Sequence, residues 1–124
     1  MAISYESVTV TARAELKRAL RSRDAAAIAA LRSLLAVLDN AGAQPPSRSD
    51  AAATVSEHFA GAVAGLGATE AERRRLDPAE VAQLVEREVA DRLEQAEQLE
   101  RAGRDRESAW ARYQAKLLSR LQGP

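Results

Sequence analysis

One segment of the sequence, Ala25–Asn40, constrains the fold more than any other because its large aliphatic residues recur at helical spacing. The residues of this repeat are separated by three, four and three positions: Ile28, Leu31, Leu35 and Leu38. Such spacing is typical of one face of an α-helix and differs from the alternation of a β-strand. Alanine, the strongest helix former, occurs 28 times, whereas the aromatic residues that favour strands make up 3% of the chain. The sequence therefore predicts an all-α protein.

Local signals place the ends of the first two predicted helices. The first is expected to begin near Thr9 or Thr11, because either hydroxyl can accept hydrogen bonds from unpaired backbone N–H groups. Asp24 is a favourable N-cap for the second helix. The sequence Asn40–Gly42 is interpreted as the C-cap of that helix, with glycine supplying a left-handed turn.

The third predicted helix has the clearest start signal in the chain. Asp77 can cap it, Pro78 occupies the first helical position, and Glu80 completes a capping box. This helix is expected to end at Ala102, before Gly103. A fourth helix is predicted from Asp105 to Leu121.

These helices predict a single helical domain over residues 1–124, built as a four-helix arrangement of two antiparallel hairpins. The hairpins cover residues 1–41 and 76–122, and residues 42–75 form a partly ordered excursion between the second and third helices. The excursion opens with a linker over residues 42–53, which contains two adjacent prolines and no large apolar residue. The residues expected to be buried together are Ile28, Leu31, Leu35, Leu38, Val85, Val89, Leu93, Leu117 and Leu121.

Charge is unevenly distributed although it sums to zero over the chain. Residues Arg13–Arg23 contain five basic residues and one acidic residue, a local net charge of +4, whereas Glu80–Glu100 contains seven acidic and two basic residues, a net of −5. A basic helix face can contact nucleic-acid phosphates. The alternative is that both are solvated faces, or that the two helices pack beside each other.

The residue types needed for catalysis or metal binding are scarce. The chain has no Cys and a single His, so a thiolate site and a His-rich metal site are excluded. His58 has no carboxylate placed to orient it, and it is interpreted as a surface or packing residue. Trp110 and Tyr113 are interpreted as core or hairpin-contact residues and not as a platform for stacking bases. We therefore expect a binding or scaffold module without catalytic residues, metal or cofactor.

The order of several short motifs resembles a known family. Leu-Lys-x-Ala-Leu begins at Leu16 and is followed by Arg23-Asp24, and Leu-Asp-x-x-Glu-Val begins at Leu76. A charged helix with Glu86-x-Glu88-x-x-x-Arg92 follows, and Ala102-Gly103-Arg104 comes next. Over residues 11–40 and 76–121 this pattern resembles the N-terminal helical part of the GatB/YqeY-like proteins. In that family a Tyr-Leu-Pro motif leads into a second helical subdomain, where this chain has Leu117–Leu121.

The resemblance implies an accessory role in tRNA binding or in tRNA-dependent amidation, which uses glutamine as amido donor in a carbon–nitrogen ligase reaction. It implies no catalysis by this chain alone, and its partner would be tRNA or an amidotransferase or other tRNA-handling protein, not DNA or a membrane. Four cations are candidate RNA contacts by charge and three by the resemblance. They are Arg13, Lys17, Arg21 and Arg23, and then Arg32, Arg92 and Arg104.

The alternative function is a protein–protein interaction module in which an apolar groove between the hairpins accepts a partner helix. A structural role for Arg32, Arg92 and Arg104 is an equal alternative to RNA contact. The first eleven residues lack the pattern of a signal peptide, and the sequence shows no long uncharged apolar run, so a cytoplasmic protein is expected.

Overall fold

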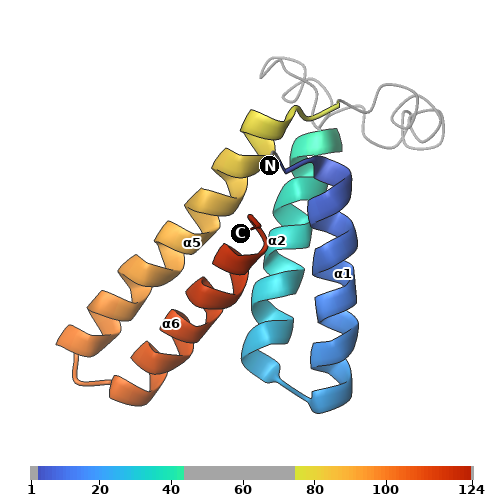
Figure 1. Cartoon of the computed structure of the whole chain (residues 1–124). Helices are drawn as coiled ribbons and strands as arrows, with labels where there is room; N and C mark the ends of the chain where they lie inside the picture. The colour runs from blue at the N-terminus through green and yellow to red at the C-terminus, as the bar shows by residue number, and fades with distance from the viewer. Residues whose placement is uncertain (1–2, 44–74, 124) are drawn as a thin grey trace, which may run out of the picture. The chain divides into compact units, whose positions relative to one another are not determined.

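The computed structural model describes residues 3–43 and 75–123. These ranges form four α-helices and no strand, in the order α1 (Tyr5–Ser22), α2 (Ala25–Ala43), α5 (Pro78–Arg101) and α6 (Asp105–Arg120) (Figure 1). The helices are arranged as two antiparallel hairpins, α1–α2 and α5–α6, which confirms the predicted all-α class. Within the described ranges, residues 3–38 and 77–123 group into one compact unit.

Most of the predicted excursion lies outside the described residues. This holds for the linker from residue 44 onward and for His58.

The first helix begins earlier than the sequence predicted. Ser4 is its N-cap: the backbone N–H of Ser7 donates to Ser4 Oγ at 3.0 Å, and the backbone N–H of Ser4 donates to Ser7 Oγ at 3.0 Å. Thr9 is buried inside the helix, and its hydroxyl donates to the carbonyl of Tyr5 at 2.8 Å. The prediction of a start at Thr9 or Thr11 is therefore wrong, because the reciprocal Ser4–Ser7 bonds already satisfy the helix end.

A tight turn joins α1 to α2. Arg23 adopts the left-handed conformation, with φ 58° and ψ 42°, and the backbone N–H of Asp24 donates to the carbonyl of Ala19 at 2.9 Å. Asp24 Oδ1 then accepts the backbone N–H of Ala27 at 3.0 Å, which confirms Asp24 as the predicted cap.

At its other end α2 continues further than expected. Gly42 is helical and buried, and the helix ends at Ala43. The predicted C-cap at Asn40–Gly42 is wrong because glycine permits a left-handed turn but does not enforce one. Among the described glycines, only Gly103 and Gly123 have a positive φ.

The second hairpin follows the sequence signals closely. Asp77 Oδ1 accepts the N–H of Glu80 at 2.9 Å, Glu80 Oε1 accepts the N–H of Asp77 at 3.1 Å, and Pro78 is the first helical residue. After Arg101 the chain turns through Gly103, whose φ is +78°. The predicted boundaries of these two helices are confirmed to within about one residue.

The core of the described unit is aliphatic. Its largest fully buried side chains are Val8, Leu31, Leu34, Leu38, Val81, Val85 and Leu118. Of the nine residues predicted to be buried, five are: Leu31, Leu38, Val85, Leu117 and Leu121. Three are only partly buried, namely Ile28, Leu35 and Val89.

One side chain contradicts the predicted core, because Leu93 is 43% exposed. Trp110 and Tyr113 are 48% and 42% exposed and are not core residues, but the Tyr113 hydroxyl donates to Asp24 at the start of α2, which is a contact between the hairpins. Leu34 and Leu118 are fully buried instead. The helical period identifies a stripe, but the direction from which neighbouring helices approach decides which edge of the stripe is covered.

The helix α2 is long and apolar enough to cross a membrane, judged by its 19 residues and mean hydropathy of 1.3. Leu31, Leu34 and Leu38 of this helix are fully buried among the other helices of the unit. A central helix of a helical bundle has the same composition, so the hydropathy of α2 follows from its position in the core.

Polar contacts connect the two hairpins at separate levels. Ser33 on α2 donates to Glu88 Oε1 on α5 at 3.1 Å, and Gln114 Nε2 on α6 donates to the carbonyl of Ala26 at 2.9 Å. Within the second hairpin, the buried hydroxyl of Ser108 donates to the carbonyl of Ala96 at 2.8 Å. Because these bonds are directional, they fix the register of α2 against α5 and α6.

Candidate nucleic-acid interface

A row of three cations lies on the outer face of α1. Arg13, Lys17 and Arg21 follow one another at intervals of four residues, so they project from one side of the helix about one turn apart. All three are exposed, and none has an ion-pair or hydrogen-bond partner among the residues that the structure describes. We call these three residues the α1 basic row.

Next to this row, α1 also carries an ion pair. Arg18 Nη1 lies 3.6 Å from Glu15 Oε2, and the two side chains are 74% and 28% exposed. An exposed pair at this distance contributes about 0–1 kcal/mol. Arg18 is therefore weakly held and available to a ligand.

The remaining cations predicted as RNA contacts do not join the α1 basic row as a single site. Arg23 is exposed in the turn after α1, and Arg32 is exposed on α2. Arg104 Nη2 donates to Glu107 Oε2 at 2.9 Å, an exposed pair in the first turn of α6. Arg104 is thus engaged within its own hairpin.

Arg92 is the most deeply placed of the predicted cations. Its Nη1 donates to Glu88 Oε1 at 2.8 Å, and the two side chains are 16% and 10% exposed. The same carboxylate oxygen accepts the Ser33 hydroxyl, so Arg92 belongs to a polar network between α2 and α5. The Nε of Arg92 is buried without a hydrogen-bond partner within the described part of the chain. This placement favours the structural interpretation of Arg92.

A small polar cleft lies between α1, the start of α2 and α6. Its volume is about 210 Å³. The charged and hydroxyl groups that line it are Glu15, Arg18, Ser22, Asp24, Tyr113 and Arg120. We call it the α1–α6 cleft. Sequence reasoning did not bring these residues together, because Asp24 and Tyr113 are 89 positions apart.

A hydrogen bond joins Tyr113 to Asp24 in this cleft. The Tyr113 hydroxyl donates this hydrogen bond to Asp24 Oδ2. This bond, with the backbone N–H of Ala27, lowers the pKa of the Asp24 carboxyl below its ordinary value. The same bond to Asp24, together with desolvation, raises the pKa of the Tyr113 hydroxyl. Asp24 therefore stays ionised at neutral pH, and its bond to the hydroxyl fixes the orientation of the Tyr113 ring.

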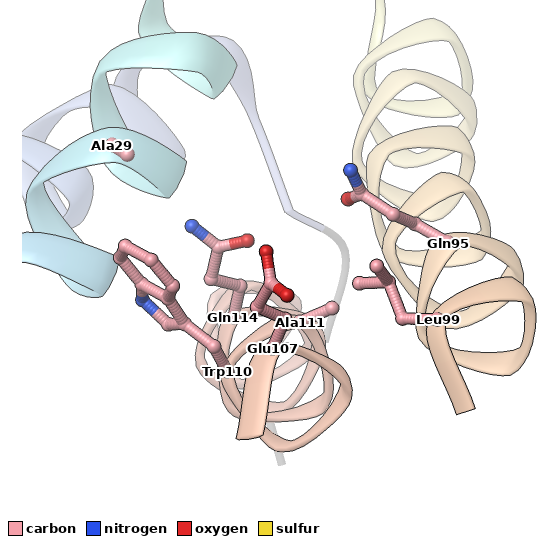
Figure 2. A pocket seen from close by; sticks show the side chains of 7 residues that line it. All are labelled: Ala29, Gln95, Leu99, Glu107, Trp110, Ala111 and Gln114. Carbon is pink, nitrogen blue, oxygen red and sulfur yellow. The ribbon is translucent and has the colours of Figure 1, made fainter. Parts of the chain in front are cut away.

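A second concave region lies between α2, α5 and α6, with a volume of about 270 Å³ (Figure 2). Ala29 forms part of its α2 wall and Gln95 and Leu99 form its α5 wall, while α6 contributes four further side chains. These four are Glu107, Trp110, Ala111 and Gln114. We call it the Trp110 groove. The indole extends from α6 toward the α2 side of the groove (Figure 2).

Within residues 3–43 and 75–123, no three His, Cys, Asp or Glu residues are close enough together to hold a metal ion. The hydroxyl of Ser22, the one serine in the α1–α6 cleft, donates to the carbonyl of Ala19 in its own helix at 3.3 Å. The described surface thus offers charge, hydrogen bonds and aromatic faces, which suit it to binding.

Comparison of this chain with protein families, with curated proteins and with solved structures gives no match.

Proposed function

We propose that the chain is a non-catalytic RNA-binding module, a GatB/YqeY-like accessory protein that acts in tRNA binding or tRNA-dependent amidation. The observation that supports this proposal most strongly is the α1 basic row, whose three exposed cations have no partner among the described residues. Successive cations on such a row are about 6 Å apart, close to the spacing of phosphates along a single strand. As the proposed ligand is RNA, we also propose a cytoplasmic location.

The expected affinity is low and depends strongly on salt. Three phosphate contacts give a slope of about −2 to −3 in a plot of log affinity against log salt concentration. The net charge of zero provides no long-range attraction. We therefore expect binding at low ionic strength that fades at physiological salt.

Fluorescence anisotropy with labelled tRNA at two salt concentrations tests the proposal. The variant Arg13→Glu/Lys17→Glu/Arg21→Glu should abolish binding without changing helicity. The matched control reverses three other exposed cations, Arg87, Arg101 and Arg106, and so makes the same change in net charge. If both triple variants bind alike, the α1 basic row is not the site, and if the wild-type protein shows no salt-dependent binding, the proposal is wrong.

The Trp110 groove favours a second candidate function, the docking of an amphipathic partner helix. Trp110 leaves 48% of its surface exposed beside the small side chains of Ala29 and Ala111, which allow a partner backbone to approach closely. Such binding would bury apolar surface and would persist at high salt. Association that survives high salt and is lost in Trp110→Ala would support this candidate over RNA binding.

A further inference from the structure

We propose that the α1–α6 cleft holds one nucleotide of single-stranded RNA, with the base stacked on the Tyr113 ring and its phosphate between Arg18 and Arg120. This inference rests on the proposed RNA-binding function and extends it from the outer face of α1 into a defined site. It also reverses the sequence-based interpretation that Tyr113 is not a platform for stacking bases, since the side chain is 42% exposed.

The first step of the argument concerns the aromatic ring. Tyr113 lines the cleft, and its hydroxyl is bonded to Asp24, which itself caps α2 through the N–H of Ala27. The ring is therefore held at two ends, by its own helix and by the start of α2. An exposed ring with little remaining freedom loses little entropy when a base stacks on it.

The second step concerns the cations. Arg120 lines the cleft from α6 and has no hydrogen-bond or ion-pair partner in the described ranges, while Arg18 lines it from α1 in a long, exposed pair with Glu15. Because they come from different helices, the two guanidinium groups can approach a phosphate from both sides. Arginine also suits this role because its planar fork matches a phosphate.

The third step concerns the relation of the cleft to the α1 basic row. Neighbouring residues of a helix point about 100° apart, so Arg18 and Ser22 face the cleft while Lys17 and Arg21 face another side of α1. A strand that binds both the row and the cleft therefore crosses from one side of α1 to the other. Single-stranded sites commonly combine a cationic track of this kind with aromatic rings on which bases stack.

The carboxylates of the cleft, Glu15 and Asp24, set its net charge and so affect which ligand it binds. Glu15 and Asp24 balance Arg18 and Arg120, so the four charges sum to zero and a free phosphate ion gains no net attraction. The Asp24 carboxylate is already committed to Ala27 and Tyr113. The site thus favours a base that is delivered with its phosphate over an isolated anion.

Anisotropy titrations with a labelled short oligouridylate, with inorganic polyphosphate as competitor, test the inference. Tyr113→Ala should weaken binding of the oligouridylate about 5- to 150-fold, the range found when a stacking ring is removed. Tyr113→Phe keeps the ring and loses only the Asp24 bond that orients it, so it should weaken binding much less than Tyr113→Ala. Arg120→Ala should weaken binding and reduce the salt slope by about 1.

A matched control lies elsewhere on the described surface. Arg101→Ala removes an exposed cation from α5, outside the cleft, and should leave the affinity unchanged. Competition by polyphosphate should be equally strong in wild type and Tyr113→Ala, because a chain without bases cannot stack. Tyr113→Leu, which retains bulk, replaces Tyr113→Ala if circular dichroism shows that the alanine variant has lost helix.

The outcomes separate the two proposals. If the wild type binds the oligouridylate with the expected salt dependence but Tyr113→Ala and Arg120→Ala bind equally well, the cleft inference is wrong and the α1 basic row stands. If the wild type binds neither tRNA nor the oligouridylate at low salt, both proposals are wrong. If Tyr113→Ala loses affinity for polyphosphate as much as for the oligouridylate, the ring acts on charge placement and not by stacking, which overturns the inference.

Discussion

The helices α2 and α5, one from each hairpin, bury different kinds of side chain. The buried side of α2 consists of Leu31, Leu34 and Leu38, each fully buried, whereas the buried side of α5 combines Val81 and Val85 with an ionised pair, Glu88 and Arg92. Their turns differ as well, because the first hairpin reverses through an arginine and the second through a glycine. The comparison teaches that the buried face of α2 is aliphatic, whereas α5 also buries charge, and the Ser33 hydroxyl of α2 joins that charged pair across the two hairpins.

The largest expected effect tests the apolar half of this comparison. Leu34→Ala should cost about 2–5 kcal/mol of unfolding free energy because Leu34 is fully buried and its removal leaves a cavity. Leu35→Ala, one position along, should cost less than about 2 kcal/mol because Leu35 is only partly buried. Urea denaturation of both variants measures the difference. Equal losses would show that the buried face of α2 is assigned to the wrong edge of its stripe.

The second prediction concerns the ion pair of α5, Glu88 and Arg92. Glu88→Ala should cost about 1–3 kcal/mol, because it leaves Arg92 without its partner in a site where the Arg92 side chain is 16% exposed. Replacing both residues with methionine should recover stability to within about 1 kcal/mol of wild type, since a buried ion pair adds little beyond an apolar pair. A double-mutant cycle by chemical denaturation checks this. If the double methionine variant is no more stable than Glu88→Ala, the network contributes more to the free energy of unfolding than the charge balance between Glu88 and Arg92.

A smaller effect is expected at the two hairpin turns, where Gly103 and Arg23 both have a positive φ. Gly103→Ala should cost about 1–2 kcal/mol, because φ is +78° and a side chain is strained there even though an added Cβ meets no atom within 4 Å. Arg23→Gly should change stability by about 0–1 kcal/mol in the stabilising direction, since glycine relieves the φ of 58° but gains entropy in the unfolded chain. Thermal melts of both variants measure these changes in stability. Loss of stability in Arg23→Gly would show that the arginine side chain itself supports its turn.

The smallest effect concerns the bond that links the hairpins in the α1–α6 cleft. Tyr113→Phe removes the hydroxyl that lowers the pKa of Asp24 and whose own pKa is raised by Asp24. The stabilisation from Asp24 is present above its unfolded pKa and lost as pH falls through the lowered folded value. That from Tyr113 is present below its unfolded pKa and lost as pH rises through the raised folded value.

Because both groups are partly exposed, the difference between wild type and Tyr113→Phe should stay below about 1 kcal/mol. It should be largest near neutral pH and shrink toward both extremes. Denaturation over a pH series measures it. A difference that does not vary with pH would show that the hydroxyl contributes packing alone.

How much could be predicted from the sequence depended on whether each signal is local. The start of α5 was predicted correctly because Asp77 and Glu80 bond each other's backbone within one turn. The start of α1 was misplaced because a Ser4–Ser7 box is a weaker pattern than the threonines that follow it. The end of α2 was misplaced because Gly42 continues the helix to Ala43 and does not take the left-handed conformation that glycine permits.

The candidate site also contains one part that local spacing predicts and one part that depends on tertiary contacts. The spacing of Arg13, Lys17 and Arg21 places them on one face of any helix that contains them, so their grouping followed from the sequence. The α1–α6 cleft did not, because it needs Arg18 of α1 beside Tyr113 and Arg120 of α6. Arg92 was predicted as a surface contact, and only the position of Glu88 shows its place in an internal network.

The sequence by itself thus determined the helices of the described ranges, most of their ends and the faces that carry charge. These features depend on backbone hydrogen bonds and side chains within one or two turns. The tertiary structure alone decided which edge of each apolar stripe is buried, that Leu93 and Trp110 remain exposed, and that Asp24 meets Tyr113. Those outcomes depend on the angle and register at which one hairpin meets the other, and many side chains distributed over all four helices set these together.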